Sequence, residues 1–490
     1  MADQPGTLLP CAPPSVVRRR SLLTALGGVL LLSALTAASA SSQAADTSTG
    51  QWTSVDLGPR IDFGVGSVGT HVLIAGGYTS DGSGNFTYFD RVDMYDSTTA
   101  AWSAASLSEP RSDPVLVSVG PQVLIAGGQT VVRAASQTVD IYDSVGDSWT
   151  TASLPTLSGS YLHSATSGTR AFFMDPPSTD IDVYDSATGG WSTIKPPRLR
   201  VIRGSASVGS QVLVWGENRN PQSSAPLVDS NDVDVYDSAA GQWIAQSAAK
   251  VDRDSSAVTV GSQVLFDSGV APDQVTIYDA AAGTWSTAKL SQPRDGPSIA
   301  VLGSRVLLVG GLLNRSVASD AVDIYESATG RWTSTRLSQP RSGAAIVSVG
   351  SRLIIAGGRN GTAHEDATGD TFASSVDVYD GETARWTTAR LSVRRDQVAP
   401  AAVGTLALFA GGFAPPLLDR HQHRLVNAVD VYEATSGTWS TASLSRARES
   451  AQVVVVGTQV LFIGGMAGCS GCGGSPLPPV VDIYDSVGGH

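Results

Sequence analysis

Short apolar runs separated by turn residues recur along this chain from residue 51 onward. Each unit holds an alternating run such as 114–119, a second run such as 123–128, a third such as 138–143, and a fourth that begins at a tryptophan such as Trp149. The runs have the length of strands, are rich in β-branched and aromatic residues, and are bounded by Gly, Asp and Ser. Four strands per repeat predict the blade of a β-propeller, so we expect an all-β fold.

A tyrosine followed seven positions later by a tryptophan marks the third and fourth strands of each unit. The spacing inside the pair is constant, whereas the tryptophans of successive pairs lie 42 to 54 residues apart. A period of this length indicates a repeat architecture, and we expect the aromatic pairs to pack blade against blade. The pairs are Tyr95/Trp102, Tyr142/Trp149, Tyr184/Trp191, Tyr236/Trp243, Tyr278/Trp285, Tyr325/Trp332, Tyr379/Trp386 and Tyr432/Trp439.

Double glycine ends the second strand in six units, where the missing Cβ allows a sharp turn and a close approach to a neighbour. The pairs are Gly76/Gly77, Gly127/Gly128, Gly310/Gly311, Gly357/Gly358, Gly411/Gly412 and Gly464/Gly465. The other three units have Met174-Asp175, Trp215-Gly216 and Asp267-Ser268. A double glycine, then a tyrosine, then a tryptophan after a short turn resembles the kelch repeat, over essentially residues 51–490. The resemblance implies a propeller of the galactose oxidase/kelch-like superfamily.

The two ends of the repeat region are complementary. A ninth third strand occurs at Tyr484, but the chain ends before its tryptophan, while Trp52 opens the region in a fourth strand with no third strand before it. We expect the strand around Trp52 to complete the last blade and close a ring of nine blades without leaving open edges. Nine exceeds the usual four to eight, so a smaller ring with degenerate repeats displaced is the alternative.

Residues 1–44 have the pattern of an export signal. Arg18, Arg19 and Arg20 precede an apolar core at 22–38 and small-residue cleavage sites at 38–40 or 42–44. The segment also resembles a twin-arginine signal, and a retained membrane anchor is the alternative. We therefore expect residues 45–490 to form the propeller and the protein to be secreted or periplasmic.

The formal net charge of the 490-residue chain is −12. An acidic body argues against nucleic-acid and anionic-membrane partners, and no second membrane-spanning candidate follows the signal. We expect a monomer without cofactors.

Binding is expected on one face of the ring. The first-to-second and third-to-fourth turns are short and uniform, whereas the second-to-third loops vary and share a face with the connections between blades. Variable loops on a rigid scaffold are common binding sites, and similar kelch propellers use this loop-rich side for partners. The long loops are 78–90, 217–231, 359–375, 413–428 and 466–480.

An arginine also lies nine residues before the glycine of the first turn in seven units, with Gly159 and Asp252 at this position in the other two. Because the position precedes the innermost strand, we expect these side chains to ring the mouth of the central channel as an anion site suited to carboxylates. The alternative is that each arginine braces the blades through acidic or carbonyl groups. The seven are Arg60, Arg111, Arg200, Arg294, Arg341, Arg395 and Arg448.

Other candidates for chemistry are weaker. The histidines of Asp419–His423 and the acidic group of His364–Asp366 with Asp370 lack further metal ligands at a recognised spacing. Cys469 and Cys472 are expected to form a local disulfide after export rather than a zinc site, and Asn85, Asn314 and Asn360 begin glycosylation sequons.

Two functions remain open. The first is a non-catalytic binding module for a protein or a glycan. The second is an enzyme. Copper radical oxidases of similar fold need two histidines and a cysteine-linked tyrosine, but this chain has six histidines, one of them terminal, and no cysteine in the ring before residue 469. The residues after Glu365 do not match a plant specifier protein. Sialic-acid mutarotases use arginine and acidic residues in the channel mouth, which the arginine series leaves open. We found no catalytic constellation, so binding is the leading hypothesis.

Overall fold

In the computed structural model, residues 47–490 form one compact unit. The structure describes residues 50–81, 85–132, 134–156, 162–175, 180–198, 200–218, 228–247, 251–252, 255–267, 271–361, 372–415, 424–467, 475–476 and 480–487. All regular elements within these ranges are strands. In the described part of the chain there is no helix long and apolar enough to cross a membrane.

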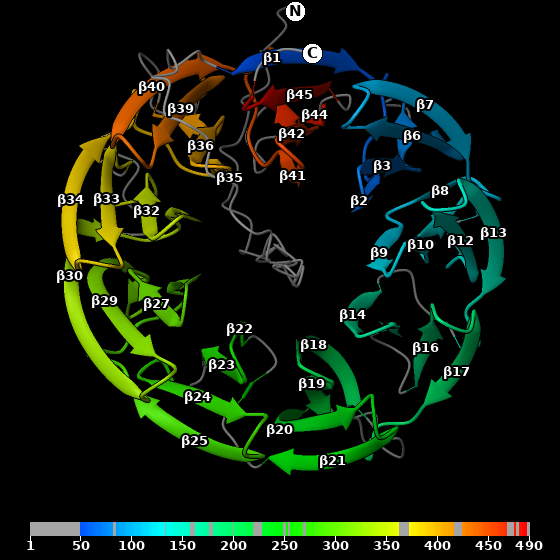
Figure 1. Ribbon diagram of the computed structural model, residues 1–490, viewed down its shortest axis with the longest axis horizontal. Coiled ribbons are helices and arrows are strands. Elements are labelled where there is room, and N and C mark those ends of the chain that lie inside the picture. The colour runs from blue at the N-terminus through cyan, green and yellow to red at the C-terminus, as the bar shows by residue number, and fades with distance from the viewer. Residues whose placement is uncertain are drawn as a thin grey trace, which may run out of the picture. The chain divides into compact units, whose positions relative to one another are not determined.

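Nine four-stranded antiparallel blades succeed one another around a central channel, as the chain runs from blue to red in Figure 1. The first four blades are β2 (Gly64–Val68), β3 (His71–Ala75), β6 (Arg91–Asp96) and β7 (Ala101–Ser106); β9 (Val115–Val119), β10 (Gln122–Ala126), β12 (Thr138–Asp143) and β13 (Ser148–Ser153); β14 (His163–Ser167), β15 (Arg170–Met174), β16 (Ile181–Asp185) and β17 (Gly190–Ile194); and β18 (Arg200–Val208), β19 (Gln211–Asn218), β20 (Val228–Asp237) and β21 (Gln242–Ser247).

The fifth to eighth blades are β22 (Ala257–Val260), β23 (Gln263–Asp267), β24 (Gln274–Asp279) and β25 (Thr284–Lys289); β26 (Ser298–Leu302), β27 (Arg305–Val309), β29 (Val317–Glu326) and β30 (Arg331–Arg341), with β28 (Leu312–Leu313) added to β29; β31 (Ala345–Val349), β32 (Arg352–Ala356), β33 (Ser375–Asp380) and β34 (Arg385–Arg390); and β35 (Ala399–Val403), β36 (Leu406–Ala410), β39 (Ala428–Glu433) and β40 (Thr438–Ser443).

Blade 9 joins the two ends of the repeat region. It consists of β41 (Gln452–Val456), β42 (Gln459–Ile463), β45 (Val480–Asp485) and β1 (Gln51–Asp56). Strand β1 runs antiparallel to β45 with Trp52 opposite Tyr484, and the two strands lie together at the top of Figure 1. The blades thus number nine, as the sequence predicts, rather than fewer.

Short ribbons occupy the connections on the loop-rich face. They are β4 (Tyr78–Ser80) with β5 (Phe86–Tyr88), β8 (Arg111–Ser112) with β11 (Gln129–Thr130), β37 (Phe413–Ala414) with β38 (Arg424–Leu425), and β43 (Met466–Ala467) with β44 (Ser475–Pro476). Within the described residues, the variable loops are therefore partly ordered by their own hydrogen bonds.

The second and third strands of each blade are buried on both faces, because each blade is sandwiched between two others. In β10, for example, Val123, Leu124, Ile125 and Ala126 are all fully buried, which explains the continuous apolar runs. The outer strands are mostly exposed, and their half-buried positions are the tryptophan, which lies against the tyrosine of the neighbouring strand, and the residue three positions later. The spacing of apolar residues in each strand thus depends on whether one or both faces of the strand are covered by other residues.

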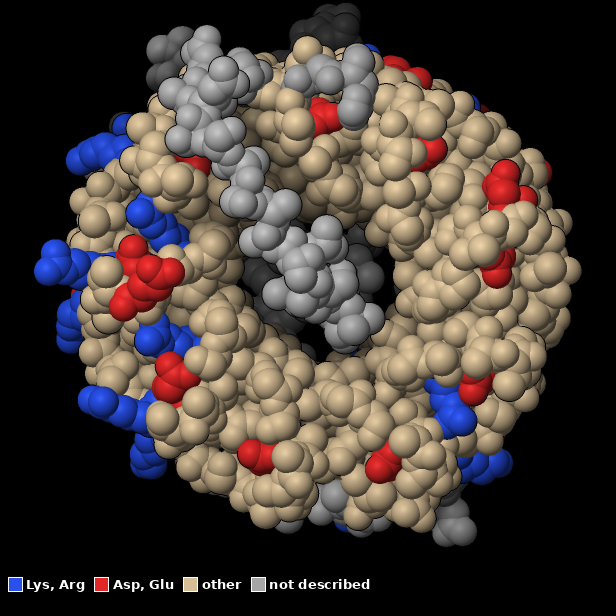
Figure 2. All heavy atoms as spheres, viewed as in Figure 1, with Lys and Arg blue, Asp and Glu red and all other residues tan. Residues whose placement is uncertain are grey.

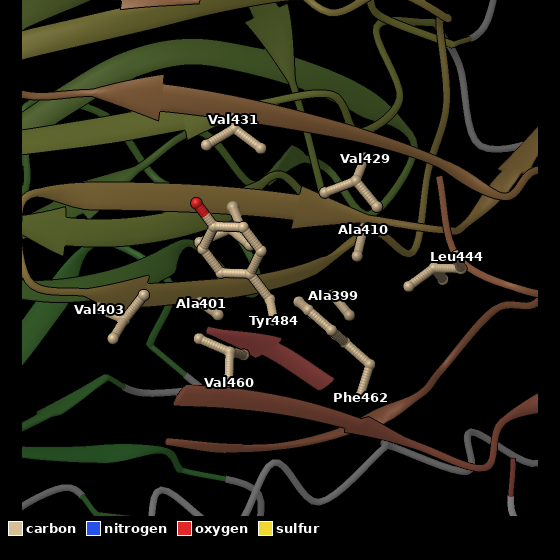
Figure 3. Packing of buried hydrophobic residues seen from close by; sticks show 11 residues of the cluster. Ala399, Ala401, Val403, Ala410, Val429, Val431, Leu444, Val460, Phe462 and Tyr484 are labelled. Carbon is tan, nitrogen blue, oxygen red and sulfur yellow. The ribbon is translucent and has the colours of Figure 1, made fainter. Parts of the chain in front are cut away.

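Nine apolar clusters fill the nine junctions between blades. Figure 3 shows the one between blades 8 and 9, where Tyr484 and Phe462 pack on alanines and valines of β35 and β39. Trp52 packs against this cluster, with its ring 5.0 Å from Tyr484 and 6.1 Å from Phe462. Another cluster joins Val72 and Ile74 of blade 1 to strands of blade 9, so the core is continuous around the ring.

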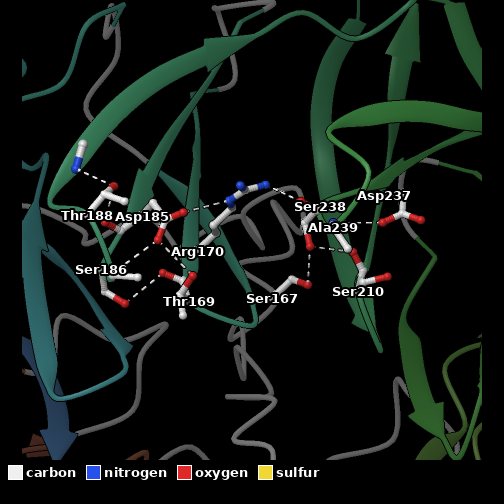
Figure 4. Close-up of polar contacts among 12 residues, drawn as sticks. Ser167, Thr169, Arg170, Asp185, Ser186, Thr188, Ser210, Asp237, Ser238 and Ala239 are labelled. Carbon is white, nitrogen blue, oxygen red and sulfur yellow. Dashed lines mark hydrogen bonds and ion pairs between the residues drawn. The ribbon is translucent and has the colours of Figure 1, made fainter.

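Polar contacts also connect successive blades. The glutamine that begins a second strand accepts a hydrogen bond from the tyrosine hydroxyl of the next blade, and the Gln459–Tyr95 contact of 2.9 Å links the last blade to the first. The other pairs are Gln122–Tyr184, Gln211–Tyr278 and Gln263–Tyr325. In blade 3 the position is Arg170, which pairs with Asp185 and donates to the carbonyl of Ser238 in blade 4 (Figure 4).

The uniform third-to-fourth turns are organised by the acidic residue that ends each third strand. Asp96 accepts hydrogen bonds from the backbone N–H and hydroxyl of Thr98 and from the hydroxyl of Thr99. Burial raises the pKa of Asp96, but the hydrogen bonds from Thr98, Thr99 and Thr70 together outweigh it and lower the pKa to about 2. The turn is therefore held by hydrogen bonds within itself and by contacts with Thr70 of the first-to-second turn.

Candidate functional site

Six of the seven arginines expected at the channel mouth lie inside the blades. Their side chains are at most 2% exposed, and each forms an ion pair with the aspartate two residues before the tyrosine of its own blade. We call these six pairs the arginine clamps. They are Arg60–Asp93, Arg111–Asp140, Arg294–Asp323, Arg341–Asp377, Arg395–Asp430 and Arg448–Asp482.

The clamp of blade 2 illustrates the geometry. Arg111 Nη2 lies 2.6 Å from Asp140 Oδ2 and 2.9 Å from the carbonyl oxygen of Ile125, and Nη1 donates to the carbonyl oxygen of Thr138. The other carboxylate oxygen of Asp140 accepts the backbone N–H of Ser108. One aspartate therefore holds both ends of the segment that enters the blade.

Ionisation of these buried groups depends on the pairing. Burial lowers the pKa of Arg111, and the charge of Asp140 opposes this effect. The same opposition between burial and the paired aspartate acts on the pKa of Arg341 and Arg395. A guanidinium group remains charged in such a site because its counter-charge and carbonyl acceptors are already in place.

In four of the six arginine clamps, the backbone of the arginine connects its blade to the preceding blade. The second glycine of the double-glycine pair donates its N–H to the arginine carbonyl, and the first glycine lies so close that a side chain would collide with it. The contacts are Gly77 to Arg111, Gly311 to Arg341, Gly358 to Arg395 and Gly412 to Arg448, at 2.8 to 3.2 Å. The arginine side chain therefore stabilises its own blade, while its carbonyl attaches that blade to the preceding one.

Substituting Gly310 with alanine tests this close approach. A Cβ there would lie 2.2 Å from the carbonyl oxygen of Arg341, at a φ of +60°, and we expect a loss of about 3 kcal/mol in the free energy of unfolding. The matched control is Gly330→Ala in the same blade, where φ is +68° but no atom lies within 4 Å. Chemical denaturation should show a loss of about 1–2 kcal/mol for the control, and equal losses for the two variants would contradict the close approach.

Two blades have no arginine at the clamp position, and blade 5 supports the view that the arginine and the aspartate act as a pair. Blade 5 has Asp252 in place of the arginine and Thr276 in place of the aspartate, so both partners are replaced together. Blade 3 has Gly159, which lies outside the described residues, and its Asp182 accepts hydrogen bonds from Thr156 and Thr193 instead. The backbone of Arg200 begins β18, but its side chain is not among those described.

A ligand in the channel would therefore not meet free guanidinium groups from these six arginines. These six arginines brace their blades, as the alternative hypothesis stated, and they do not form an exposed ring at the mouth of the channel. The prediction missed the aspartate partners, although the joint replacement of Arg and Asp in blade 5 is a signal present in the sequence.

The wall of the channel is almost uncharged. Apart from His163, Arg200, Arg203 and Gln452, the nine inner strands consist of small, apolar and hydroxyl residues, and the visible part of this wall carries neither sign of charge in Figure 2. Among their described side chains, only His163 and Arg203 are ionisable. Arg203 donates to Glu217 at 2.7 and 3.0 Å, and burial, followed by the charge of Arg203, lowers the pKa of His163.

A polar pocket of about 730 Å³ lies on the loop-rich face of blade 7, and we call it the blade 7 pocket. Three connections form it: the entry to blade 7, the second-to-third loop of that blade, and the entry to blade 8. Its lining residues are Gln339, Asn360, Phe372, Ala373, Ser374, Ser375, Arg390, Leu391, Ser392 and Arg394. In Figure 2 most visible Lys and Arg side chains lie on the left, the side that β30 and β34 occupy in Figure 1.

Hydrogen bonds from a clamp hold the wall of this pocket. Arg341 Nη2 donates to the Ser375 hydroxyl at 2.6 Å, Gln339 donates to the same hydroxyl, and the amide of Asn360 donates to Gln339 at 3.4 Å. Of these lining residues, Gln339 and Ser375 lie on β30 and β33, and their hydrogen bonds tie the loop residue Asn360 to these strands.

An arginine covers the adjoining aromatic residues. Arg359 pairs with Asp396 at 2.7 Å and lies 5.6 Å from the ring centres of both Phe372 and Phe413. The guanidinium group therefore lies against these two rings, and the exposed lining residues of the pocket all carry hydrogen-bonding groups.

The remaining sequence candidates are placed as follows. Cys469 and Cys472, the histidines of 419–423 and the group 364–370 lie outside the described residues, so the disulfide stays a prediction. Asn85, Asn314 and Asn360 lie in loops of the described part. Among the described residues there is no group of three or more metal-ligating side chains.

Two segments, residues 110–153 and 340–390, match the family model described as Kelch motif. Each match begins one residue before a clamp arginine and ends with the fourth strand of the same blade, so the motif and the structural blade coincide. The chain is a kelch-repeat propeller. No curated protein matches this kelch propeller. Among solved structures, the crystal structure of the computationally designed Ika8 protein is similar at a TM-score of 0.46 and 10% identity, over 75% of this chain and 95% of that chain.

Proposed function

We propose that this kelch propeller is an exported, non-catalytic binding protein that holds a protein or glycan partner on its loop-rich face. The observation that carries the proposal is the blade 7 pocket, which has arginines and amides in its lining and stands on a scaffold braced by the arginine clamps. Kelch propellers commonly mediate protein interactions. A rigid ring with variable loops provides such a surface without any moving part.

Pocket variants test this function, because replacing a buried clamp arginine by itself would destabilise the blade and confuse a loss of binding with a loss of stability. The protein is immobilised, and the exported fraction of the source cells is passed over it. Wild-type protein should retain a macromolecular partner, and the double variant Arg390→Ser/Arg394→Ala should lose it. The position of Arg390 is occupied by Ser443 in blade 8, and the position of Arg394 is occupied by Ala447 at the entry to blade 9. Both substitutions therefore copy residues that the same fold already accepts, and they should be tolerated.

The matched control is Arg385→Thr, which removes an exposed arginine from the other end of β34 and copies Thr438 of blade 8. The control should retain the partner like the wild type. Equal retention by all variants would place the binding site elsewhere on the protein.

The second candidate is an enzyme that acts on a small acid or a sugar in the channel. The cluster of His163, Arg203 and Glu217 favours it, because titratable groups on an otherwise uncharged wall can position an anion beside a proton acceptor. Turnover of an anionic sugar that is abolished by His163→Ala would support this function and replace the non-catalytic one.

A further inference from the structure

In several blades, the residue four positions after the tryptophan of the outer strand is a lysine or an arginine, and it forms an ion pair with an aspartate of the same blade. Four residues after the tryptophan, Lys289 of blade 5 pairs with Asp273 at 3.4 Å, and Arg336 of blade 6 pairs with Asp320 at 2.8 Å. Both aspartates stand five residues before the tyrosine of the same blade. In blade 3, Lys195 pairs with Asp180, one position further along. The rule in these blades is that the cation is neutralised by its own sheet.

Blade 7 keeps the cation and lacks the aspartate. Arg390 occupies the same place opposite Ser375, and the position of the missing aspartate is held by Ser374. Arg390 is exposed and forms no ion pair with any described residue. Both Arg390 and Ser374 line the blade 7 pocket, so the departure from the pattern falls where the surface is hollowed.

The other lining residues of the blade 7 pocket show what kind of ligand could neutralise the charge of Arg390. No carboxylate is present among its described lining residues, although the chain is acidic overall. The apolar lining residues Phe372, Ala373 and Leu391 are buried, whereas the amides, the hydroxyls and the arginines are at least partly exposed. No aromatic or aliphatic side chain is exposed among these lining residues, so the pocket lacks the anchors typical of a protein interface.

We propose that the blade 7 pocket binds an acidic sugar, with its carboxylate or sulfate on Arg390 and its hydroxyls on Gln339, Asn360 and Ser374. This inference rests on the proposed function and names its ligand class as a glycan. A guanidinium group pairs with an oxyanion through two parallel hydrogen bonds, and a pocket of this size suits one or two sugar units. A peptide partner is the outcome that the test must exclude.

Restoring the missing aspartate tests the proposal without removing any arginine. Binding of galacturonic acid, a sulfated galactose and neutral galactose to the full protein is measured by calorimetry. We expect the wild type to bind at least one acidic sugar and not galactose, and the two acidic probes distinguish carboxylate from sulfate. Ser374→Asp, which copies Asp320 of blade 6, should weaken binding about tenfold or more, because the new carboxylate pairs with Arg390.

Arg390→Ser should weaken binding by a similar factor, and Arg385→Thr on the same strand should leave it unchanged. Thermal unfolding of each variant close to that of the wild type shows that the fold is retained. Equal affinity for galactose, no effect of Ser374→Asp, or binding of an oligo-glutamate peptide in place of the sugars would overturn the inference. A protein partner retained by the wild type but not by the pocket double variant, without sugar binding, would leave the proposed function standing. Turnover of the sugar would remove that function while leaving the ligand class intact.

Discussion

Replacing Asp140 with threonine, the residue that blade 5 has at this position, is expected to lower the free energy of unfolding by about 3–5 kcal/mol. The substitution leaves the fully buried guanidinium group of Arg111 without its counter-charge and frees the backbone N–H of Ser108. Losing one partner of a buried ion pair costs more than the pair itself contributes, because the remaining charge stays desolvated. Denaturation in urea, followed by tryptophan fluorescence, measures the loss.

Two further variants identify the cause. Asp320→Ser removes an ion pair whose arginine is 72% exposed, and it should cost less than about 1 kcal/mol. The double variant Arg111→Met/Asp140→Thr should recover most of the stability that Asp140→Thr loses, since no buried charge remains. A loss below 1 kcal/mol for Asp140→Thr would mean that the clamp does not brace the blade.

Deleting β1 (Gln51–Asp56) is expected to have the second large effect. Blade 9 would lose its outer strand and the contact of Trp52 with Tyr484 and Phe462, and β45 would present an unpaired edge. An open edge next to the apolar residues of β45 is a template for pairing with another chain. We expect a lower melting temperature and association into larger species, measured by calorimetry and light scattering.

Addition of a synthetic peptide with the sequence of residues 50–56 should reverse both changes, because the strand is held by non-covalent contacts alone. A peptide with Trp52 replaced by alanine is the control and should restore less. If the truncated protein stayed monomeric with an unchanged melting temperature, strand β1 would contribute nothing to ring closure.

Much of the architecture follows from local patterns in the sequence. The constant spacing between Tyr142 and Trp149, and its counterparts, places two paired strands in every blade, since the residues are directly opposite in the observed register. The continuous apolar runs of the second strands predict burial on both faces. The unmatched Trp52 and Tyr484 predict how many blades the ring has. The pairing and burial of the strands depend on residues close together in the chain, and the number of blades follows from counting the repeats, so the sequence alone is enough to predict them.

Whether the arginine side chains are buried or exposed could not be predicted from the sequence in the same way. Residues such as Arg111 recur at a fixed distance from a turn, but recurrence is compatible with an exposed ring and with a buried brace. Only the folded blade brings Asp140, which is 29 residues away in the chain, within 2.6 Å of the guanidinium group. The exposure of a charged side chain depends on what packs around it, and that is a property of the assembled sheet.

The sequence by itself determined the repeat, the four strands of each blade and the number of blades, because each depends on the period of apolar and aromatic positions. Tertiary structure alone decided which cations are neutralised: it paired Arg341 with Asp377 and Arg336 with Asp320, and left Arg390 beside Ser374 in a pocket. The physical reason is that periodicity sets which face a residue occupies, whereas charge compensation requires two groups from distant segments to meet within a few ångströms.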